Sequence, residues 1–252
     1  MRLAHQVALI LIGILAVNLV CDAQSASSPS PTPESISEKA GAAMTAGNAD
    51  IARKDVGSAR THYREAVELS RQLPGELYRL RAEALKKLAE VYDYEKHFSS
   101  GEALLKERLG ILEQHPASAG IEVGLALCDL VTHYGMTQEV DKAVDAARRG
   151  VIFYKRCIST GKNTDLCNRR LADVEGMVGA ILFKANRFSE SEPWFESVVS
   201  RADESVRPQI MLASLRGYAK VLRDKGESER ASRLEERANA FERNHPGVFG
   251  DN

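Results

Sequence analysis

The sequence has few aromatic residues, almost no net charge and, after residue 20, no long apolar run. Aromatics make up 6% of its 252 residues, and β-branched or aromatic stretches bounded by turn residues are missing, which argues against strands. The 34 basic and 35 acidic residues leave a formal charge of −1, so no strong field attracts nucleic acid or an anionic membrane surface. Ala, Leu, Glu and Arg recur throughout, and this composition favours an all-α protein without a nucleic-acid partner.

Recognisable catalytic and cofactor motifs are also missing. No helix carries a His-x-x-x-His pair, and no Cys-x-x-Cys, glycine-rich phosphate loop, nucleophile elbow or dinucleotide fingerprint occurs. His133 follows Cys128 by five residues, but that offset is about 500° of helical rotation, which points the two side chains apart. We interpret Cys128 as a small core residue. The sequence therefore predicts no enzyme, no cofactor and no metal site.

The first 23 residues read as a signal peptide. A short basic start, Met1–His5, precedes a nearly uninterrupted apolar stretch, Val7–Val20, and about fourteen apolar residues rarely span a bilayer. Small residues at Cys21 and Ala23 occupy the −3 and −1 positions of a cleavage site after Ala23. We predict export to the periplasm or the medium.

Two alternatives would keep the protein at a membrane. One is a lipoprotein acylated on Cys21, because a Ser/Pro-rich stretch follows the cysteine as it does in such proteins. Val20, just before the cysteine, departs from the small residue that a lipobox requires. The other alternative is an uncleaved N-terminal anchor. Contact with a membrane is expected only in these two cases.

The remaining chain divides into a spacer, a helical domain and a tail. Residues 24–35 lack apolar periodicity and are rich in Ser and Pro, which predicts a flexible spacer. From Ile36 onward apolar residues recur at i, i+3, i+4 and i+7 in segments separated by short polar or Gly/Pro stretches. This pattern predicts a ladder of amphipathic helices over 36–246, followed by a C-terminal tail, 247–252.

A repeat organises the helical ladder. Five small residues, which we call marker residues, recur at spacings of 42, 42, 48 and 40: Ala59, Gly101, Ala143, Ser191 and Ala231. Each has apolar or small residues at matching offsets before and after it. In the second unit these are Leu85, Ala89, Tyr92, Phe98, Leu105 and the stem of Arg108. A single helix pair cannot bury its apolar face, so such units must stack.

On these residues the chain resembles tetratricopeptide-repeat (TPR) proteins, and its period is closest to that of kinesin light chain repeats. The best match is Lys87–Phe98 followed by Glu102–Leu109, and the likeness spans about 40–245. The resemblance implies a right-handed α-solenoid of about five antiparallel helix pairs that binds a protein or peptide. Asp50 and Glu175 stand at usually apolar positions, so the first and fourth units are expected to be distorted or to act as caps.

The resemblance also implies a groove lined by the first helix of each pair. The groove residues would be Glu83, Lys86, Glu90 and Asp93 in unit two, Leu125, Cys128, Thr132 and Gly135 in unit three, Asp173, Gly176, Ala180 and Phe183 in unit four, and Ala213, Arg216, Lys220 and Arg223 in unit five. Such a groove runs from acidic through apolar to basic and suits a peptide with an apolar centre and opposed charged ends. The alternative is a solvated face that simply carries charges.

Two further features concern the fourth unit. Phe195 occupies a core position of the repeat, whereas Trp194 is off the pattern and is either core edge or a binding anchor. The junction before this unit is six residues longer than the others and carries Cys157 and Cys167. The helix-stopping residues between the two cysteines allow a tight turn, so we predict a disulfide there, which stabilises by about 2–3 kcal/mol.

Overall fold

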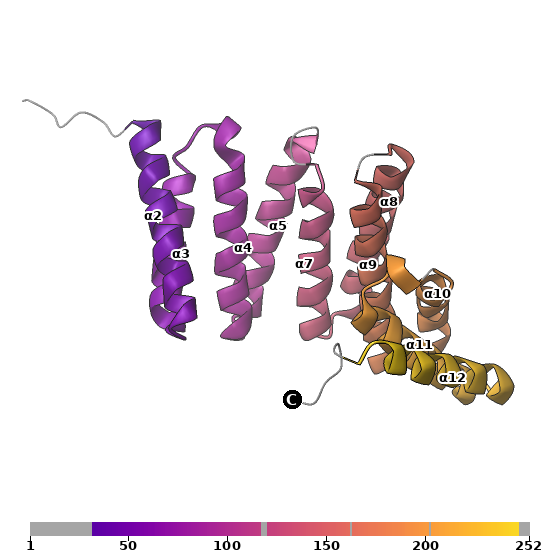
Figure 1. Ribbon diagram of the computed structural model, residues 1–252. Coiled ribbons are helices and arrows are strands. Elements are labelled where there is room, and N and C mark those ends of the chain that lie inside the picture. The colour runs from indigo at the N-terminus through magenta and orange to yellow at the C-terminus, as the bar shows by residue number, and fades with distance from the viewer. Residues whose placement is uncertain (1–31, 117–119, 162, 202, 247–252) are drawn as a thin grey trace, which may run out of the picture.

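The computed structural model describes residues 32–116, 120–161, 163–201 and 203–246 (Figure 1). The predicted signal peptide 1–23, with Cys21 and its cleavage site, lies outside the described residues, as do most of the spacer and the tail 247–252. The spacer prediction is wrong for its last three residues, because the first described helix begins at Pro33. Thr32 caps this helix by accepting a hydrogen bond from the backbone N–H of Ser35, and a proline in the first turn has the helical φ already set.

The described residues form ten α-helices in five antiparallel pairs. In chain order the pairs are α2 (Pro33–Ala52) with α3 (Val56–Ser70), α4 (Tyr78–Tyr94) with α5 (Phe98–Gln114), α7 (Glu122–Met136) with α8 (Val140–Ser159), α9 (Thr164–Lys184) with α10 (Phe188–Val199), and α11 (Pro208–Asp224) with α12 (Ser228–Asn244). Short 3-10 turns, η1 (Gly75–Leu77) and η2 (Asp203–Ser205), precede α4 and α11. The predicted all-α solenoid of five helix pairs is confirmed.

The turn within each pair has the same backbone conformation in all five units. The residue five before the marker has a positive φ every time: Lys54 62°, Lys96 63°, Gln138 61°, Asn186 59° and Gly226 81°. The next residue donates its N–H to the carbonyl five positions earlier, as His97 does to Tyr92 and Glu227 to Leu222. This is the Schellman closure of a helix end. The repeat read from the sequence therefore coincides with a repeat in the backbone.

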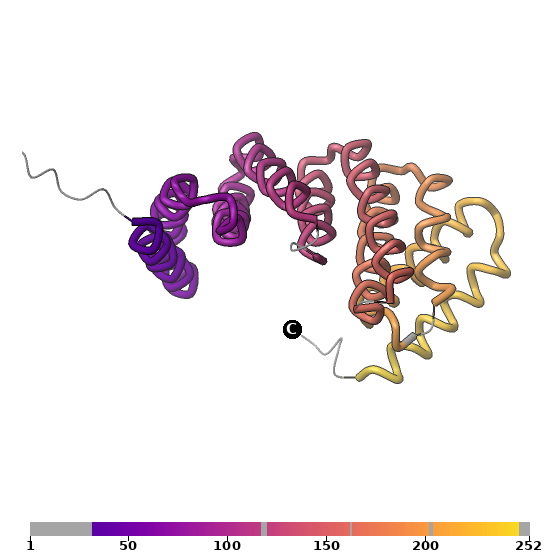
Figure 2. The backbone as a smooth tube through the Cα atoms, turned by 90° about the horizontal axis from the view of Figure 1, so that it is seen from above, coloured from indigo at the N-terminus to yellow at the C-terminus, as the bar shows by residue number. Residues whose placement is uncertain are grey.

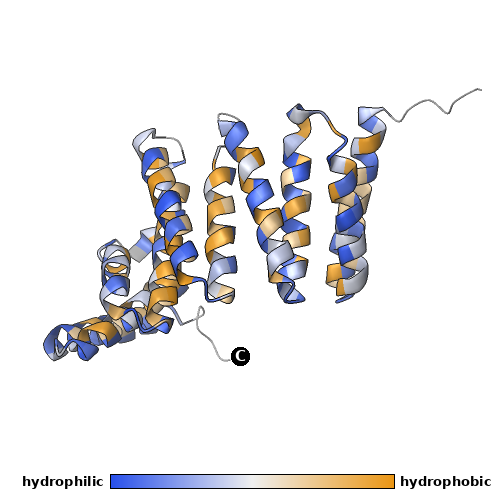
Figure 3. Ribbon diagram, turned by 180° about the vertical axis from the view of Figure 1, so that it is seen from behind, coloured by the Kyte–Doolittle hydropathy of each residue, from blue (hydrophilic) through white to orange (hydrophobic). Residues whose placement is uncertain are grey.

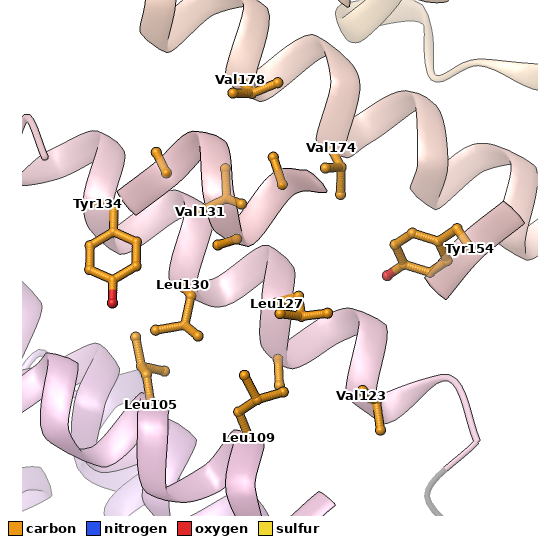
Figure 4. Packing of buried hydrophobic residues seen from close by; sticks show 14 of the residues in the cluster. Leu105, Leu109, Val123, Leu127, Leu130, Val131, Tyr134, Tyr154, Val174 and Val178 are labelled. Atoms are coloured by element: carbon orange, nitrogen blue, oxygen red, sulfur yellow. The ribbon is translucent and has the colours of Figure 1, made fainter. Parts of the chain in front are cut away.

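The repeat positions also form the core. All five marker residues are buried, as are Leu85, Leu127 and Leu215 sixteen residues before their markers. Figure 4 shows Leu127, Leu130 and Val131 of α7 between Leu105 and Leu109 of α5 and Val174 and Val178 of α9. Each first helix therefore packs both on its own partner and on the neighbouring pairs, which joins the units into one stack.

Side-chain size is matched across the two helices of a pair. In units one and four an aromatic residue lies four positions after the marker residue, and a glycine lies twelve positions before the marker residue. These residues are Tyr63 and Gly47 in unit one, and Phe195 and Gly179 in unit four. A Cβ on Gly47 would lie 2.5 Å from Tyr63 Cε1, and one on Gly179 would lie 2.8 Å from Phe195 Cε1. The two glycines therefore let the helices approach closely enough to bury the rings.

The two acidic departures from the repeat are buried and paired. Asp50 is 2% exposed and contacts Arg53 and, at 2.6 Å, His62 Nδ1. Glu175 is 3% exposed, accepts from Ser197 Oγ at 2.9 Å and pairs with Arg201 at 2.6 Å. These partners satisfy the buried carboxylates, and both units keep the common turn. The expectation that these units are distorted or act as caps stays a prediction.

The extra residues between units three and four lengthen helices rather than a loop. Helices α8 and α9 have 20 and 21 residues, compared with 17 in both α4 and α5. The predicted disulfide is present and joins Cys157, near the end of α8, to Cys167, in the first turn of α9, across a Cα–Cα distance of 6.4 Å. It ties the end of α8 to the start of α9, where Cys167 is buried and Cys157 packs against the central core cluster.

The stack is curved rather than straight. Helices α2 to α9 stand roughly side by side in Figure 1, and the chain then turns so that α11 and α12 lie at a steep angle to them. Figure 2, from above, shows the C-terminal units curling round. Apolar and polar bands run along each helix (Figure 3), as expected for amphipathic helices that bury one stripe. In the part of the chain described, no helix is long and apolar enough to cross a membrane.

Candidate binding surface

The predicted groove residues of unit two lie on α4, but their charges are paired. The Glu90 carboxylate contacts Lys86 at 3.5 Å and Lys87 at 3.3 Å. Asp93 contacts Nδ1 of His133, on α7, at 2.9 and 3.0 Å. The acidic end of the predicted gradient is therefore largely neutralised by neighbouring side chains, and Asp93 serves to join two units.

The predicted basic residues of unit five are exposed on α11, and two of them are also paired. Arg216 contacts Glu242 at 2.8 Å, and Arg223 contacts Glu235, both on α12. The Lys220 ammonium lies 5.2 Å from the centre of the Phe183 ring, a favourable cation–π arrangement. The two ion pairs join α11 to α12, and the Lys220 contact joins α11 to α9, so less free charge remains than the sequence predicts.

The middle of the predicted groove contains an open pocket with a volume of about 700 Å³. The predicted groove residues Thr132, Gly135 and Ala180 contribute to it. Its full lining is Thr132, Gly135, Met136, Gln138, Val140, Met177, Ala180, Ile181, Lys184 and Ala185. Small residues on the facing ends of α7 and α9 leave this space open, and the two methionines provide an adaptable apolar wall.

A second pocket of about 420 Å³ lies between α2 and α4. It is lined by Asn48, Ile51, Lys54, Val56, Tyr63, Lys87, Glu90, Val91 and Tyr94. Of these residues the sequence-based groove contained Glu90 alone. A usable signal was present, because Ile51 and Tyr94 are large apolar residues at the ends of first helices, outside the core positions of the repeat.

The remaining aromatic candidates lie within the packed structure. Phe183 is partly buried, with ring centres 5.2 Å from Phe188 and 6.4 Å from Phe195. Trp194 is also partly buried and packs against the central core cluster. Phe195 is buried, as the repeat predicts. Much of each predicted anchor is therefore already in contact with the protein itself.

The free thiol is poorly suited to nucleophilic chemistry. Cys128 Sγ lies 3.4 Å from the hydroxyl of Tyr154, a buried residue of α8. Burial raises the pKa of the Cys128 thiol to about 11, so almost no thiolate exists at neutral pH. His133, the nearby histidine, is bound to Asp93 instead.

The chain is similar to solved structures from which it is distant in sequence. No family model and no curated protein matches the chain. A putative kinesin light chain with TPR-like repeats from Podosopora anserina is 16% identical, with a TM-score of 0.62 over 86% of this chain and 99% of that one. BtubC from P. vanneervenii is 13% identical, with a TM-score of 0.61 over 90% and 95%.

A third similar structure contains a bound peptide. The Rap conjugation gene regulator of plasmid pLS20, in complex with the Phr* peptide, is 14% identical, with a TM-score of 0.51 over 81% of this chain and 53% of that chain. These likenesses identify the fold as a TPR-like helical repeat. The predicted fold class and resemblance are thus confirmed.

Proposed function

We propose that the protein is a non-catalytic interaction module that holds a peptide or a segment of a partner protein against the ends of its first helices. The observation that carries this proposal is the pocket of about 700 Å³ between α7 and α9. It is open, it has both apolar and polar lining residues, and it includes Thr132, Gly135 and Ala180, three of the residues that the TPR resemblance predicts for the groove. Ligand pockets in proteins combine these features.

The similar structures support a binding role without identifying the ligand. The Rap regulator is complexed with a peptide, and stacked helix pairs present extended surfaces suited to such ligands. In this protein the buried thiol and the ion-paired carboxylates described above leave no evident catalytic group at the pocket.

We further propose that the module acts outside the cytoplasm. Its N-terminal 23 residues have the pattern of a signal peptide, and the Cys157–Cys167 disulfide suits an oxidising compartment. The alternative is a component of an envelope or secretion complex that is tethered through acylated Cys21. Fractionation of the producing cells separates the two: a Cys21→Ala variant that stays soluble like the wild type supports free export, whereas loss of membrane association in that variant supports the tether.

A position-specific cross-linker tests the binding role. A photoreactive residue replaces Thr132, at the pocket, or Lys155, an exposed residue of α8 that does not line this pocket, and the purified proteins are irradiated in the native extract. We expect a discrete cross-linked polypeptide from position 132 and not from position 155. Equal cross-linking at both positions, or none at 132, would reject the pocket as a binding site.

A further inference from the structure

The two pockets described above are the same structural feature occurring twice. We number each lining residue by its distance along the sequence from the marker residue of its unit, and call this its offset. Both pockets are lined by residues at offsets −11, −8, −5 and −3 of one unit and at offsets −14, −11, −10 and −7 of the next unit. Asn48 thus corresponds to Thr132, and Val91 corresponds to Ile181. Both pockets lie where consecutive first helices end, along the lower edge of the solenoid in Figure 1.

Both pockets are bordered by apolar side chains that face solvent. Six large apolar side chains are exposed among the described residues, and three of them belong to these two pockets: Ile51 at 44%, Tyr94 at 75% and Met136 at 49%. Exposed apolar residues that gather around concave sites are typical of interaction surfaces. Three such residues in two equivalent places therefore indicate that both pockets receive apolar groups.

The equivalent position between the two pockets is closed. At the α4–α7 junction, Asp93 at offset −8 contacts His133 at offset −10, and the His133 ring packs edge-on against Phe98 with centres 6.2 Å apart. The buried His133 fills the space that Val91 and Ile181 leave open at the other two junctions. Open and closed junctions therefore alternate along the edge.

The same edge carries lysines that are free of ion pairs. Lys54 lines the first pocket, Lys184 lines the second, and Lys96 stands in the turn between them; none of the three takes part in an ion pair within the described residues. The nearby acids Glu90 and Glu95 are already paired with Lys86, Lys87 and Arg60. The edge is thus apolar in two places and carries these three lysines along its length.

We propose that this edge binds an extended acidic segment carrying two large apolar side chains about six residues apart, each next to Asp or Glu. The inference rests on the proposed function and specifies its ligand. Packed helices lie about 8–10 Å apart, so two steps place the pockets roughly 20 Å apart. An extended chain covers that distance in about six residues.

An amphipathic helix fits this edge less well. Its apolar stripe presents a side chain about every 5–6 Å. Over the distance between the pockets, some of these side chains would lie against the polar Asp93–His133 pair and Lys96. An extended segment presents apolar groups at the two pockets and keeps polar residues between them, next to the lysines.

Selection from a random library of twelve-residue displayed peptides tests the proposal, using the full-length mature protein. Enriched sequences are then synthesised with a fluorophore and measured by fluorescence anisotropy. We expect two large apolar residues about six apart with adjacent acids, and weaker binding when this spacing is changed by two residues. Lys54→Glu combined with Lys184→Glu should raise the Kd about tenfold. The matched control, Arg148→Glu with Lys155→Glu at exposed positions of α8 that line neither pocket, should bind like the wild type.

The possible failures are distinguishable. Enriched peptides without this pattern, peptides with apolar residues at helical spacing, or equal binding by the two charge-reversed proteins would overturn the ligand assignment. The proposed function would survive these results if position 132 still cross-links a polypeptide. No enriched peptide together with no cross-link at position 132 would reject both.

Discussion

At the scale of single residues, the glycines at the helix crossings are needed because an aromatic ring of the partner helix packs directly against them. A Cβ on Gly179 would lie 2.8 and 2.9 Å from two atoms of the Phe195 ring, which is buried and cannot swing away. We expect Gly179→Ala to lower the free energy of unfolding by about 1–3 kcal/mol, as measured by chemical denaturation.

The matched control for this substitution is Gly41→Ala, in the middle of α2. No neighbouring heavy atom lies within 4 Å of a Cβ at that position. Alanine should therefore raise the stability by about 0.5–1 kcal/mol through its better helix propensity. If both substitutions change stability in the same direction, close packing at Gly179 is not the cause.

Glu102 gives the protein a dependence on acidic pH. Hydrogen bonds from Lys106, then from Lys142 and Tyr134, lower the pKa of Glu102 to about 2. Since this value lies below the unfolded pKa of 4.5, the carboxylate contributes stability above about pH 4.5, and the contribution disappears as the pH falls towards 2.

We expect Glu102→Gln to lower the stability at pH 7 by about 1 kcal/mol and to have less effect at pH 2.5. Denaturation curves across this range measure the difference. A constant difference between wild type and variant at all these pH values would contradict the assigned role. Glu229→Gln is the control, because Glu229 is highly exposed and pairs with Arg233 alone, within α12.

At the scale of elements, the disulfide joins the end of α8 to the first turn of α9. Cys157 and Cys167 close a short loop, and we expect Cys157→Ser with Cys167→Ser to lower the free energy of unfolding by about 2–3 kcal/mol. A reducing agent should destabilise the wild type by a similar amount and leave the double variant unchanged. A reductant effect of equal size on the double variant would show that it acts elsewhere.

The common turn also predicts a stabilising substitution. Gln138 has a φ of 61°, and the equivalent residue in every other unit also has a positive φ. In four of the five units this residue is not glycine, and a non-glycine residue is strained in the left-handed region. Gln138→Gly should therefore raise the free energy of unfolding by about 0.5–1 kcal/mol, which is seen as a higher melting temperature. Gly226→Ala, the reverse change in the last unit, should lower it.

The sequence predicts the elements better than the surface, for a physical reason. Helix pairs, marker residues and the disulfide follow from spacing, because burial imposes a period on the chain. The partners of charged side chains have no such period. The pairing of Asp93 with His133, and of Arg216 with Glu242, depends on how neighbouring helices are placed, so the predicted charge gradient could not anticipate it.

At the scale of the whole molecule, the order of the units is fixed by contacts that differ from junction to junction. Asp93 faces His133 at one junction, whereas Gly135 faces Ile181 at the next, where a Cβ on the glycine would lie 2.8 Å from Ile181 Cδ1. These side chains stand at equivalent offsets, yet they are not interchangeable. The contact surface between consecutive units of this solenoid therefore differs from one junction to the next.

That non-equivalence limits how such a chain could grow by internal duplication of its gene. A second copy of unit two placed after the first would set Asp93 opposite a copy of Val91, at the offset that His133 now occupies. A carboxylate without a partner would then be enclosed between helices, at a cost of several kcal/mol. Lengthening this protein by one repeat would thus require a compensating change at the new joint, although each helix pair on its own resembles its neighbours.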